Sequence, residues 1–333
     1  MPSLSVLDQS VAVSGRTEDA SIRETLALAR HCESLGYRRF WVSEHHSHPS
    51  IVGSAPEVLM AAIAATTQRI RVGSAGVMLP HYAALKVAEQ FRVLEALAPG
   101  RIDLGVGRAP GSDMRTARLL RADPHQSAEN FPVQVRELQA WVSGADLPEG
   151  HPGHGVTANP MGPTTPELWM LGSSDYGAQL AAHYGLPYAF AHFITDGRGA
   201  QQALDVYRRL YRPSPRHPQP QAVLCVWALA ADTEAEAWHH FSGRERWKID
   251  RNKGALGPLL SPAEVALRPY SEAEQPELAQ LRQTALVGSG PQVAAKLRGL
   301  ADTFEVEELA VITWTHDPAA RRRSYELLAR EFV

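Results

Sequence analysis

Two patterns of hydrophobic residues alternate along the chain, one typical of strands and one typical of helices. Short runs rich in branched apolar residues, bounded by turn residues, are typical of buried parallel strands. Eight such runs occur, at Leu4–Leu7, Arg39–Val42, Ile70–Ala75, Ile102–Val106, Leu168–Leu171, Tyr188–Ala191, Val223–Ala230 and Leu309–Thr313. Segments with helical periodicity, bounded by glycine, proline or capping residues, lie between them. These are Glu18–Leu35, Pro56–Thr67, Ala84–Leu97, Ser127–Val142, Ser174–Tyr184, Gly199–Tyr211, Asp232–Phe241, Pro291–Ala301 and Pro318–Phe332.

Each predicted strand is followed by at least one predicted helix. Such alternation predicts parallel strands joined by right-handed crossovers. Eight units favour a closed (β/α)8 barrel of the TIM type over an open sheet, and 333 residues suit one such domain over 1–333.

Two stretches interrupt the alternation. Residues 146–166 are rich in glycine, proline and histidine and are expected to leave the barrel before the fifth strand. Residues 242–283 lie between the seventh strand and the eighth βα unit, and long irregular insertions of this kind are often functional. We expect a lid over the barrel mouth there, and a surface insertion without a role is the alternative. Its basic residues could help to admit an anionic ligand; they are Arg244, Arg246, Lys248, Arg251 and Lys253.

Composition excludes several classes of protein. Hydrophobic residues make up 44% of the chain, and the charge is 33 − 36 = −3, so nothing suggests a nucleic-acid partner. Two cysteines cannot form a disulfide framework, which favours a reducing cytoplasm. We expect no signal peptide and no membrane span, because the N-terminus lacks a basic region and no apolar run is long enough.

Candidate chemistry lies just after the predicted strands, because barrel active sites form at the carboxyl ends of strands. Strand 2 ends in Glu44-His45-His46, where a histidine could act as a base or hydrogen-bond donor, although a surface histidine cluster is the alternative. We expect no metal site, because no set of three or four converging ligands stands out.

Small and basic residues follow strands 3 and 4. Ser74, Ala75 and Gly76 would let a flat ligand approach the backbone, or would form a tight packing layer. Arg108, which follows Gly107, could pair with a phosphate or carboxylate, or form an ordinary salt bridge.

Strand 5 leads into a helix through two serines. Gly172, Ser173 and Ser174 precede that helix and Gly177 lies in its first turn, so its N-terminus could bind an anion. Simple N-capping by Ser174 is the alternative. Aromatic and polar residues near the ends of the last strands could line a substrate pocket or belong to the core; they are Phe190, His192, Trp227 and Trp314.

With these residues in view, the chain resembles the bacterial luciferase-like monooxygenase superfamily from Leu4 to Phe332. Five motifs in order carry the resemblance, and no single one is specific. They are residues 40–46 (FWVSEHH), 71–80 (RVGSAGVMLP), 99–111 (PGRIDLGVGRAPG), 171–174 (LGSS) with 184–187 (YGLP), and 286–289 (LVGS). The likeness is to stand-alone flavin-dependent oxidoreductases rather than to light-emitting subunits.

The resemblance implies a barrel that binds reduced FMN and uses O2, through a flavin C4a-hydroperoxide, to oxidise a small organic substrate. His45 matches the catalytic histidine of the family and Glu44 its acidic neighbour. Ala75 and Gly76 match the pair that lies against the isoalloxazine ring, in the family often joined by a cis peptide bond.

Phosphate contacts in the family match Arg108, Ser173, Ser174 and Gly177, with Ser74, Gly107 and Gly172 beside them in the same strand ends. Gly107 replaces the reactive cysteine of the light-emitting subunits, which argues against aldehyde luminescence. Gly177 replaces a hydroxyl residue, so one phosphate contact is expected to be missing.

The resemblance also implies partners. No motif for NAD(P)H is visible, so we expect a separate NAD(P)H:flavin reductase to supply reduced FMN. A homodimer packed through the helices after strands 2 and 3 is expected. Two alternatives stay open, namely hydride transfer with a deazaflavin on the same barrel, and a flavin-binding protein without catalysis.

Overall fold

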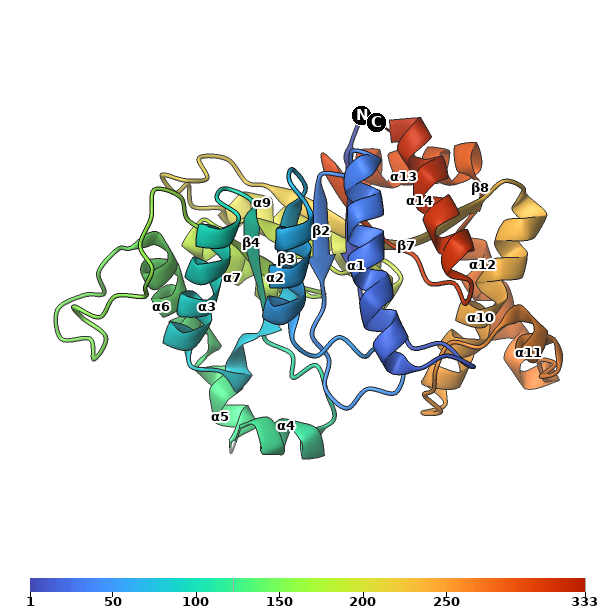
Figure 1. The fold of residues 1–333 in the computed structure, drawn as a ribbon, viewed down its shortest axis with the longest axis horizontal. Helices are drawn as coiled ribbons and strands as arrows, with labels where there is room; N and C mark the ends of the chain where they lie inside the picture. The colour runs from blue at the N-terminus through green and yellow to red at the C-terminus, as the bar shows by residue number, and fades with distance from the viewer. Residues whose placement is uncertain (122, 333) are drawn as a thin grey trace.

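Eight parallel strands close into a barrel in the computed structural model, which describes residues 1–121 and 123–332 (Figure 1). The barrel order is β1, β2, β3, β4, β5, β6, β7 and β9, and pairing of β9 with β1 and of β6 with β7 completes the ring. The strands are β1 Ser3–Asp8, β2 Arg39–Val42, β3 Arg71–Met78, β4 Ile102–Gly107, β5 Glu167–Gly172, β6 Tyr188–Phe190, β7 Ala222–Ala231, β8 Leu286–Ser289 and β9 Glu308–Ile312.

Helices surround this ring. They are α1 Glu18–Ser34, α2 Pro56–Thr66, α3 Ala84–Leu97, α4 Met114–Leu120, α5 Pro124–Glu129, α6 Phe131–Ser143, α7 Asp175–Tyr184, α8 His192–Thr195, α9 Ala200–Leu210, α10 Glu234–Asn252, α11 Pro262–Ala266, α12 Gln275–Thr284, α13 Gly290–Phe304 and α14 Pro318–Phe332, with short 3-10 turns at Leu79–His81 and Glu272–Glu274. The termini lie side by side at one end, and α4 and α5 lie at the other (Figure 1). No described helix has the length and apolar character that crossing a membrane requires.

The predicted (β/α)8 barrel is confirmed. Each of the eight predicted strands coincides with a barrel strand within a few residues, and β2 and α14 begin and end where the sequence predicts. The prediction missed β8, which pairs with the carboxyl half of β7, at Ala228–Ala231, outside the ring. β7 can pair with both β8 and β9 because its first half pairs with β9 and its second half with β8.

Between the fourth and fifth strands, one predicted helix needs correction and one helix was missed. The predicted single helix Ser127–Val142 is two helices, α5 and α6, with Pro132 in the first turn of the second. Proline has no N–H to donate, and the first turn of a helix is the place where that missing donor costs no helical hydrogen bond, so Pro132 marks the start of a new helix. Helix α4 was not predicted; Asp113 caps it by accepting a hydrogen bond from the Thr116 N–H at 2.9 Å.

Residues 242–283 are largely helical, so the expectation of an irregular insertion is wrong. Helix α10 does not end at Phe241 but runs on to Asn252, and α11 and α12 follow. Gly243 is needed within the helix because an added Cβ would lie 2.4 Å from the Leu260 carbonyl oxygen. The Ser242-Gly243 pair therefore marks a close backbone approach rather than a helix end.

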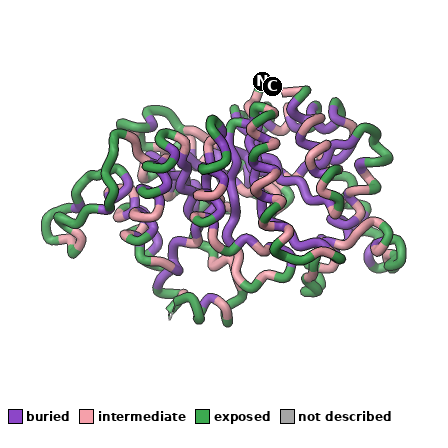
Figure 2. Tube along the Cα trace, viewed as in Figure 1, coloured by how far each residue is buried: buried purple, intermediate pink, exposed green. Residues whose placement is uncertain are grey.

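Apolar side chains of the described residues form two large clusters and a smaller one around β8 and α10, and buried residues follow the strands through the centre (Figure 2). One cluster lies between the outer face of the barrel and the helices, and a second lies inside the barrel. Trp41 and Trp169 belong to the inner cluster and meet edge to face, with ring centroids 5.2 Å apart. Large side chains thus occupy the barrel interior near its N-terminal end.

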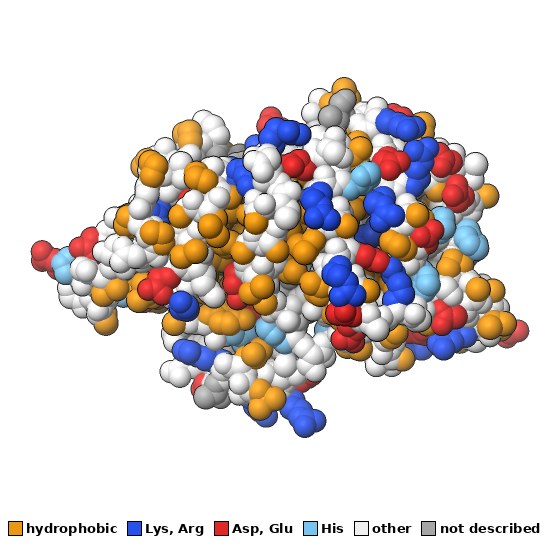
Figure 3. All heavy atoms as spheres, viewed as in Figure 1, with side chains coloured by type: hydrophobic (Ala, Val, Ile, Leu, Met, Phe, Trp, Pro, Cys, Tyr) orange, Lys and Arg blue, Asp and Glu red, His pale blue; other side chains and the backbone are white. Residues whose placement is uncertain are grey.

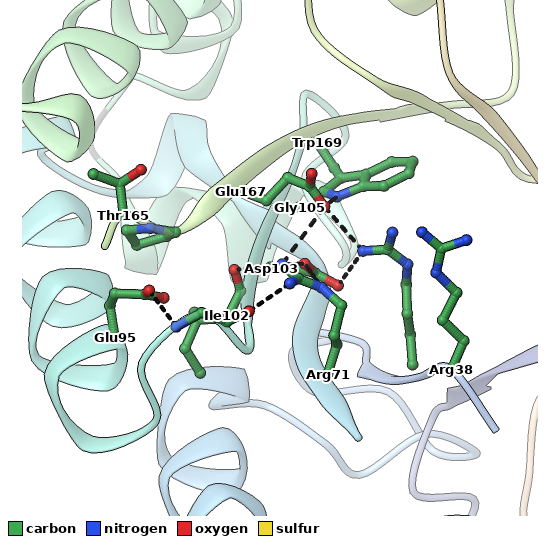
Figure 4. Close-up of polar contacts among 12 residues, drawn as sticks. Arg38, Arg71, Glu95, Ile102, Asp103, Gly105, Thr165, Glu167 and Trp169 are labelled. Carbon is green, nitrogen blue, oxygen red and sulfur yellow. Dashed lines mark hydrogen bonds and ion pairs between the residues drawn. The ribbon is translucent and has the colours of Figure 1, made fainter. Parts of the chain in front are cut away.

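A charged network surrounds these tryptophans at the starts of the strands (Figure 4). Asp103 accepts hydrogen bonds from Arg39, Arg71 and the Trp41 indole, each at 2.9 Å. Arg39 also donates to Glu167 at 3.0 Å and to Glu308 at 2.9 Å. Burial opposes the charge of Arg39, but its carboxylate partners outweigh burial and raise its pKa above the usual value. The network joins β2, β3, β4, β5 and β9.

We predict that Asp103→Ala lowers the free energy of unfolding by about 3–5 kcal/mol, because it leaves the buried Trp41 indole without an acceptor and removes one of the three carboxylates around buried Arg39. Urea unfolding followed by circular dichroism measures the change. Arg23→Ala is the control, since the Arg23–Asp19 ion pair is exposed and its loss should hardly matter. A loss as small as that of the control would contradict the structural role of the network.

Candidate active site

A cavity of about 460 Å³ opens at the carboxyl end of the barrel. Residues from the ends of most barrel strands line it, as expected for this fold. It brings together most of the predicted site residues: His45, Ala75, Gly76, Gly107, Arg108, Gly172, Ser173, Ser174, Gly177, Trp227 and Trp314.

His45 follows β2 and lies partly buried in the cavity wall. Its backbone N–H donates to the Gly53 carbonyl at 2.9 Å, and its Nδ1 lies 3.3 Å from the Ser43 Oγ. Burial first, and then the neighbouring His48 and His46, lower the pKa of His45 to about 4. The imidazole is therefore neutral near pH 7, able to accept a proton at one nitrogen and donate from the other.

Glu44 does not line the cavity. It is buried, and its carboxylate accepts hydrogen bonds from the Tyr82 hydroxyl at 2.7 Å and the Met78 N–H at 3.1 Å. His46 Nε2 lies 2.7 Å from the same carboxylate. Glu44 thus ties the end of β2 to the end of β3, so its position suits orientation of the strand ends rather than contact with a ligand.

The end of β3 forms a flat, small-residue wall. Ala75 and Gly76 line the cavity and are joined by a cis peptide bond, as the resemblance implied. Ser74 points elsewhere, because its hydroxyl donates to the Gly105 carbonyl at 2.9 Å and accepts from the Gly105 N–H at 3.1 Å. Ser74 therefore links β3 to β4 and does not reach the cavity.

Free donors gather where β4 and β5 end. Ser174 is the N-cap residue of α7, but its side chain makes no capping hydrogen bond, so the predicted alternative of simple N-capping is not seen. Arg108 stacks over the Tyr176 ring, 4.2 Å from its centroid. A helix N-terminus beside a guanidinium and two serine hydroxyls suits a phosphate.

Phe190 and His192 do not line this cavity, so that part of the prediction is wrong. Strand residues alternate between faces, and Ala189 points inward while Phe190 packs in the outer core. The His192 ring lies 5.9 Å from the Phe304 ring, and Phe193 contributes to the cavity instead.

Helix α10 supplies cavity residues that the strand-end rule missed. Arg244, Trp247 and Arg251 line the cavity, at a helical spacing that places them on one face. Of the basic residues expected to help admit an anionic ligand, Arg244, Arg246 and Lys248 are buried, whereas Arg251 and Lys253 are exposed. Arg246 pairs with Glu274 and Lys248 with Asp196. The helical spacing of Arg244, Trp247 and Arg251 would have predicted their common face if the predicted helix had extended past Gly243.

The cavity contains one cysteine, and its thiol is buried. Cys225 lines the cavity, but burial, with a contribution from Glu308, raises the pKa of its thiol to about 12, so it is no nucleophile near neutral pH. Within residues 1–121 and 123–332, no group of three histidine, cysteine or carboxylate side chains is placed to hold a metal ion.

Fold and site together define a (β/α)8-barrel protein with a cavity at its mouth and free hydrogen-bond donors at the ends of β4 and β5. The family model described as luciferase-like monooxygenase matches residues 2–304, and the chain belongs to that family of oxidoreductases. A luciferase-like monooxygenase of Escherichia coli K12 is 38% identical over 97% of this chain and 95% of its own. An N-acetyl-S-alkylcysteine monooxygenase of Bacillus subtilis is 35% identical over 98% and 97%.

Among solved structures, apo-MsnO8 superposes with a TM-score of 0.90 at 37% identity, covering 100% of this chain and 98% of its own. The fold is shared with more distant proteins. The oxygenating constituent of 3,6-diketocamphane monooxygenase, solved with FMN, has a TM-score of 0.72 at 19% identity. An F420-dependent secondary alcohol dehydrogenase has a TM-score of 0.70 at 13% identity. These two likenesses concern the fold alone.

We predict that His45 makes folding stability depend on pH. Its folded-state pKa lies below that of an unfolded histidine, so the unfolded chain binds more protons between about pH 4 and 6.5. Stability therefore rises with pH across that window, and His45→Gln should make the rise smaller. Urea unfolding at about pH 4.5 and about pH 7 measures it.

The exposed His183 on α7 offers the matched control, because His183→Gln should leave the difference between the two pH values unchanged. An identical pH dependence in wild type and His45→Gln would contradict the burial of a neutral imidazole.

Proposed function

We propose that the protein is an FMN-dependent monooxygenase that uses reduced FMN and O2 to oxidise a small organic substrate. The observation that carries the proposal is the arrangement of the cavity. A partly buried neutral histidine after β2, a small-residue wall at the end of β3 and uncapped donors at the α7 N-terminus after β5 lie around one cavity.

The residues fit the parts of FMN. Arg108, Ser173 and Ser174 would hold the phosphate, and the main-chain N–H groups at the start of α7 would add donors. Ala75 and Gly76 present no bulky side chain, so an isoalloxazine ring could lie against the end of β3. An added Cβ at Gly107 would meet only the Met78 sulfur, at 3.7 Å, which leaves open space beside that wall.

Reduced FMN, when bound, would supply the two electrons that activate O2. His45 would hold or move a proton at its free imidazole nitrogen, since its low pKa keeps the ring neutral at working pH. Glu44 would act indirectly, by fixing the strand ends that carry His45 and Met78. Apolar lining residues such as Leu7, Ile51 and Trp314 would exclude water from the reacting atoms.

Residues 242–283 are proposed to cover this site. Trp247 donates to the Ser50 hydroxyl at 2.8 Å, and the Leu259 N–H donates to the Ala12 carbonyl at 2.8 Å. These bonds attach the segment to the loops after β1 and β2, which supports a closed cover over the mouth.

A separate NAD(P)H:flavin reductase is proposed to supply reduced FMN. We also propose a homodimer through α2 and α3, where exposed Val58, Val93 and Leu97 contribute to an apolar area on the face seen in Figure 3. Sedimentation velocity at micromolar concentration tests the homodimer, and a monomer there would contradict it.

The proposal predicts saturable binding of reduced FMN and a change in its reaction with oxygen. Anaerobic titration followed by absorbance measures binding. Mixing with aerated buffer then measures how fast oxidised flavin returns, which should be slower than for free reduced FMN. N-acetyl-S-alkylcysteines are the first substrates to test, given the relative that acts on them.

Two results would contradict this function. Binding of reduced F420 but not of reduced FMN would favour the hydride-transfer alternative. Binding of FMN with no effect on its reoxidation and no product from any substrate would favour a flavin-binding protein without catalysis.

Arg108→Ala should weaken binding of FMN about tenfold or more, because a charge-assisted hydrogen bond to the phosphate is lost. Binding of riboflavin, which has no phosphate, should hardly change. The exposed Arg115 on α4 gives the control Arg115→Ala, with no expected effect on either flavin. An equal loss for FMN and riboflavin would remove the phosphate assignment.

A further inference from the structure

A buried guanidinium without an anion partner faces the cavity from α10. Arg244 retains 7% of its accessible surface, and its Nε and Nη1 have no hydrogen-bond partner among the described residues. The nearby Asp196 carboxylate instead accepts from Lys248 Nζ at 3.0 Å. Burial lowers the pKa of Arg244 to about 9, which still leaves it charged near pH 7. The protein thus holds a positive charge in its interior, and no carboxylate side chain of residues 1–121 and 123–332 forms an ion pair with it.

Three indoles surround this charge. The guanidinium carbon lies 4.8 Å from the Trp247 ring centroid, 5.4 Å from that of Trp314 and 5.5 Å from that of Trp227. Aromatic faces stabilise a cation, but they accept no conventional hydrogen bond from its N–H groups. The cage therefore offsets part of the cost of burial and leaves the donors available.

Two of the indoles add further unused donors. Trp227 Nε1 and Trp314 Nε1 are buried, and neither has an acceptor among the described residues. Both side chains line the same cavity as Arg244. A buried donor without a partner is costly, and one positive charge with several such donors is complementary to a small anion.

The position of this donor cluster separates it from the phosphate site. Arg108 and the two serines lie at the ends of β4 and β5, whereas Trp227 and Trp314 come from β7 and the end of β9, farther around the ring. Arg244 and Trp227 also line a second cavity of about 60 Å³, which holds only about two water molecules. An organic ligand must therefore reach Arg244 from the large cavity.

We infer that Arg244, with the Trp227 and Trp314 indole N–H groups, binds the carboxylate of the substrate, so the substrate is a mainly apolar organic monocarboxylate. The inference rests on the proposed function for the oxidation itself, but not for the binding. The apolar part of the acid would extend along Ile51 and Phe193 toward the wall formed by Ala75 and Gly76.

The test compares acids with their neutral amides, using phenylacetate against phenylacetamide and hexanoate against hexanamide. Quenching of tryptophan fluorescence measures binding, because three indoles surround the guanidinium. Wild type should bind each acid at least about tenfold more tightly than its amide, as expected for hydrogen bonds to a charged group. Arg244→Gln should abolish this preference, and Arg244→Lys should keep part of it.

Two further variants test the site even if the Arg244 variants do not fold. Trp314→Phe and Trp227→Phe keep an aromatic ring and remove one N–H donor, so each should weaken acid binding several-fold and leave amide binding unchanged. Arg209→Gln removes an exposed charge on α9 and is the control for net charge. Equal affinity of wild type for acids and amides, or a preference that survives Arg244→Gln, would overturn the inference.

Flavin titrations keep the two proposals apart. Arg244→Gln should change the affinity for oxidised and reduced FMN by less than about threefold, within the range that context alone produces. A selective loss of reduced FMN would assign Arg244 to the anionic flavin ring instead, and would overturn the substrate role. If wild type binds no flavin but still selects acids through Arg244, the cofactor proposal fails and the carboxylate site stands.

Discussion

The volume inside the barrel is the constraint on which the site depends. Eight strands enclose an interior that side chains can just fill, so a cavity exists only where those side chains are small. Trp41 fills the lower interior opposite Gly73, where an added Cβ would lie 2.6 Å from its ring. Toward the carboxyl ends of β3 and β4 the inward residues shrink to Ala75 and Gly107. Trp41 thus fills the barrel below the cavity, and the small residues leave room above it.

Two buried arginines illustrate how a ligand site differs from a structural one. Arg39 has three carboxylates around it, and their attraction outweighs burial, so its pKa rises. Arg244 is equally enclosed but has aromatic faces in place of carboxylates, and burial lowers its pKa. Burial alone therefore says little about role; a buried charge whose partner is missing from the protein is the informative case.

The fold was largely predictable because its local signals agree with its global pattern. Strand β2 and helix α3 are bounded by residues that end one period and start another, and their predicted limits match the structure. The elements that the sequence analysis missed or ended too early leave no clear local signal in the sequence. Strand β8 is four residues long and pairs outside the ring, so no periodicity marks it. Gly243 looks like a helix end, yet it is there because another backbone passes close to the helix.

The candidate site also has one part that the sequence predicts and one part that it does not. Residues placed by strand ends, such as His45 and Arg108, follow from the barrel geometry once the strands are known. Phe190 was assigned to the wrong face of β6. Successive strand residues alternate between the two faces, and β6 has only three residues, so a shift of one residue reverses the assignment. Arg244 lies in the part of α10 beyond Phe241, far in sequence from any strand end, so no strand-end rule reaches it. The part of the cavity that suits a shared cofactor is thus readable from sequence, whereas the part proposed to select the substrate depends on how the insertion packs.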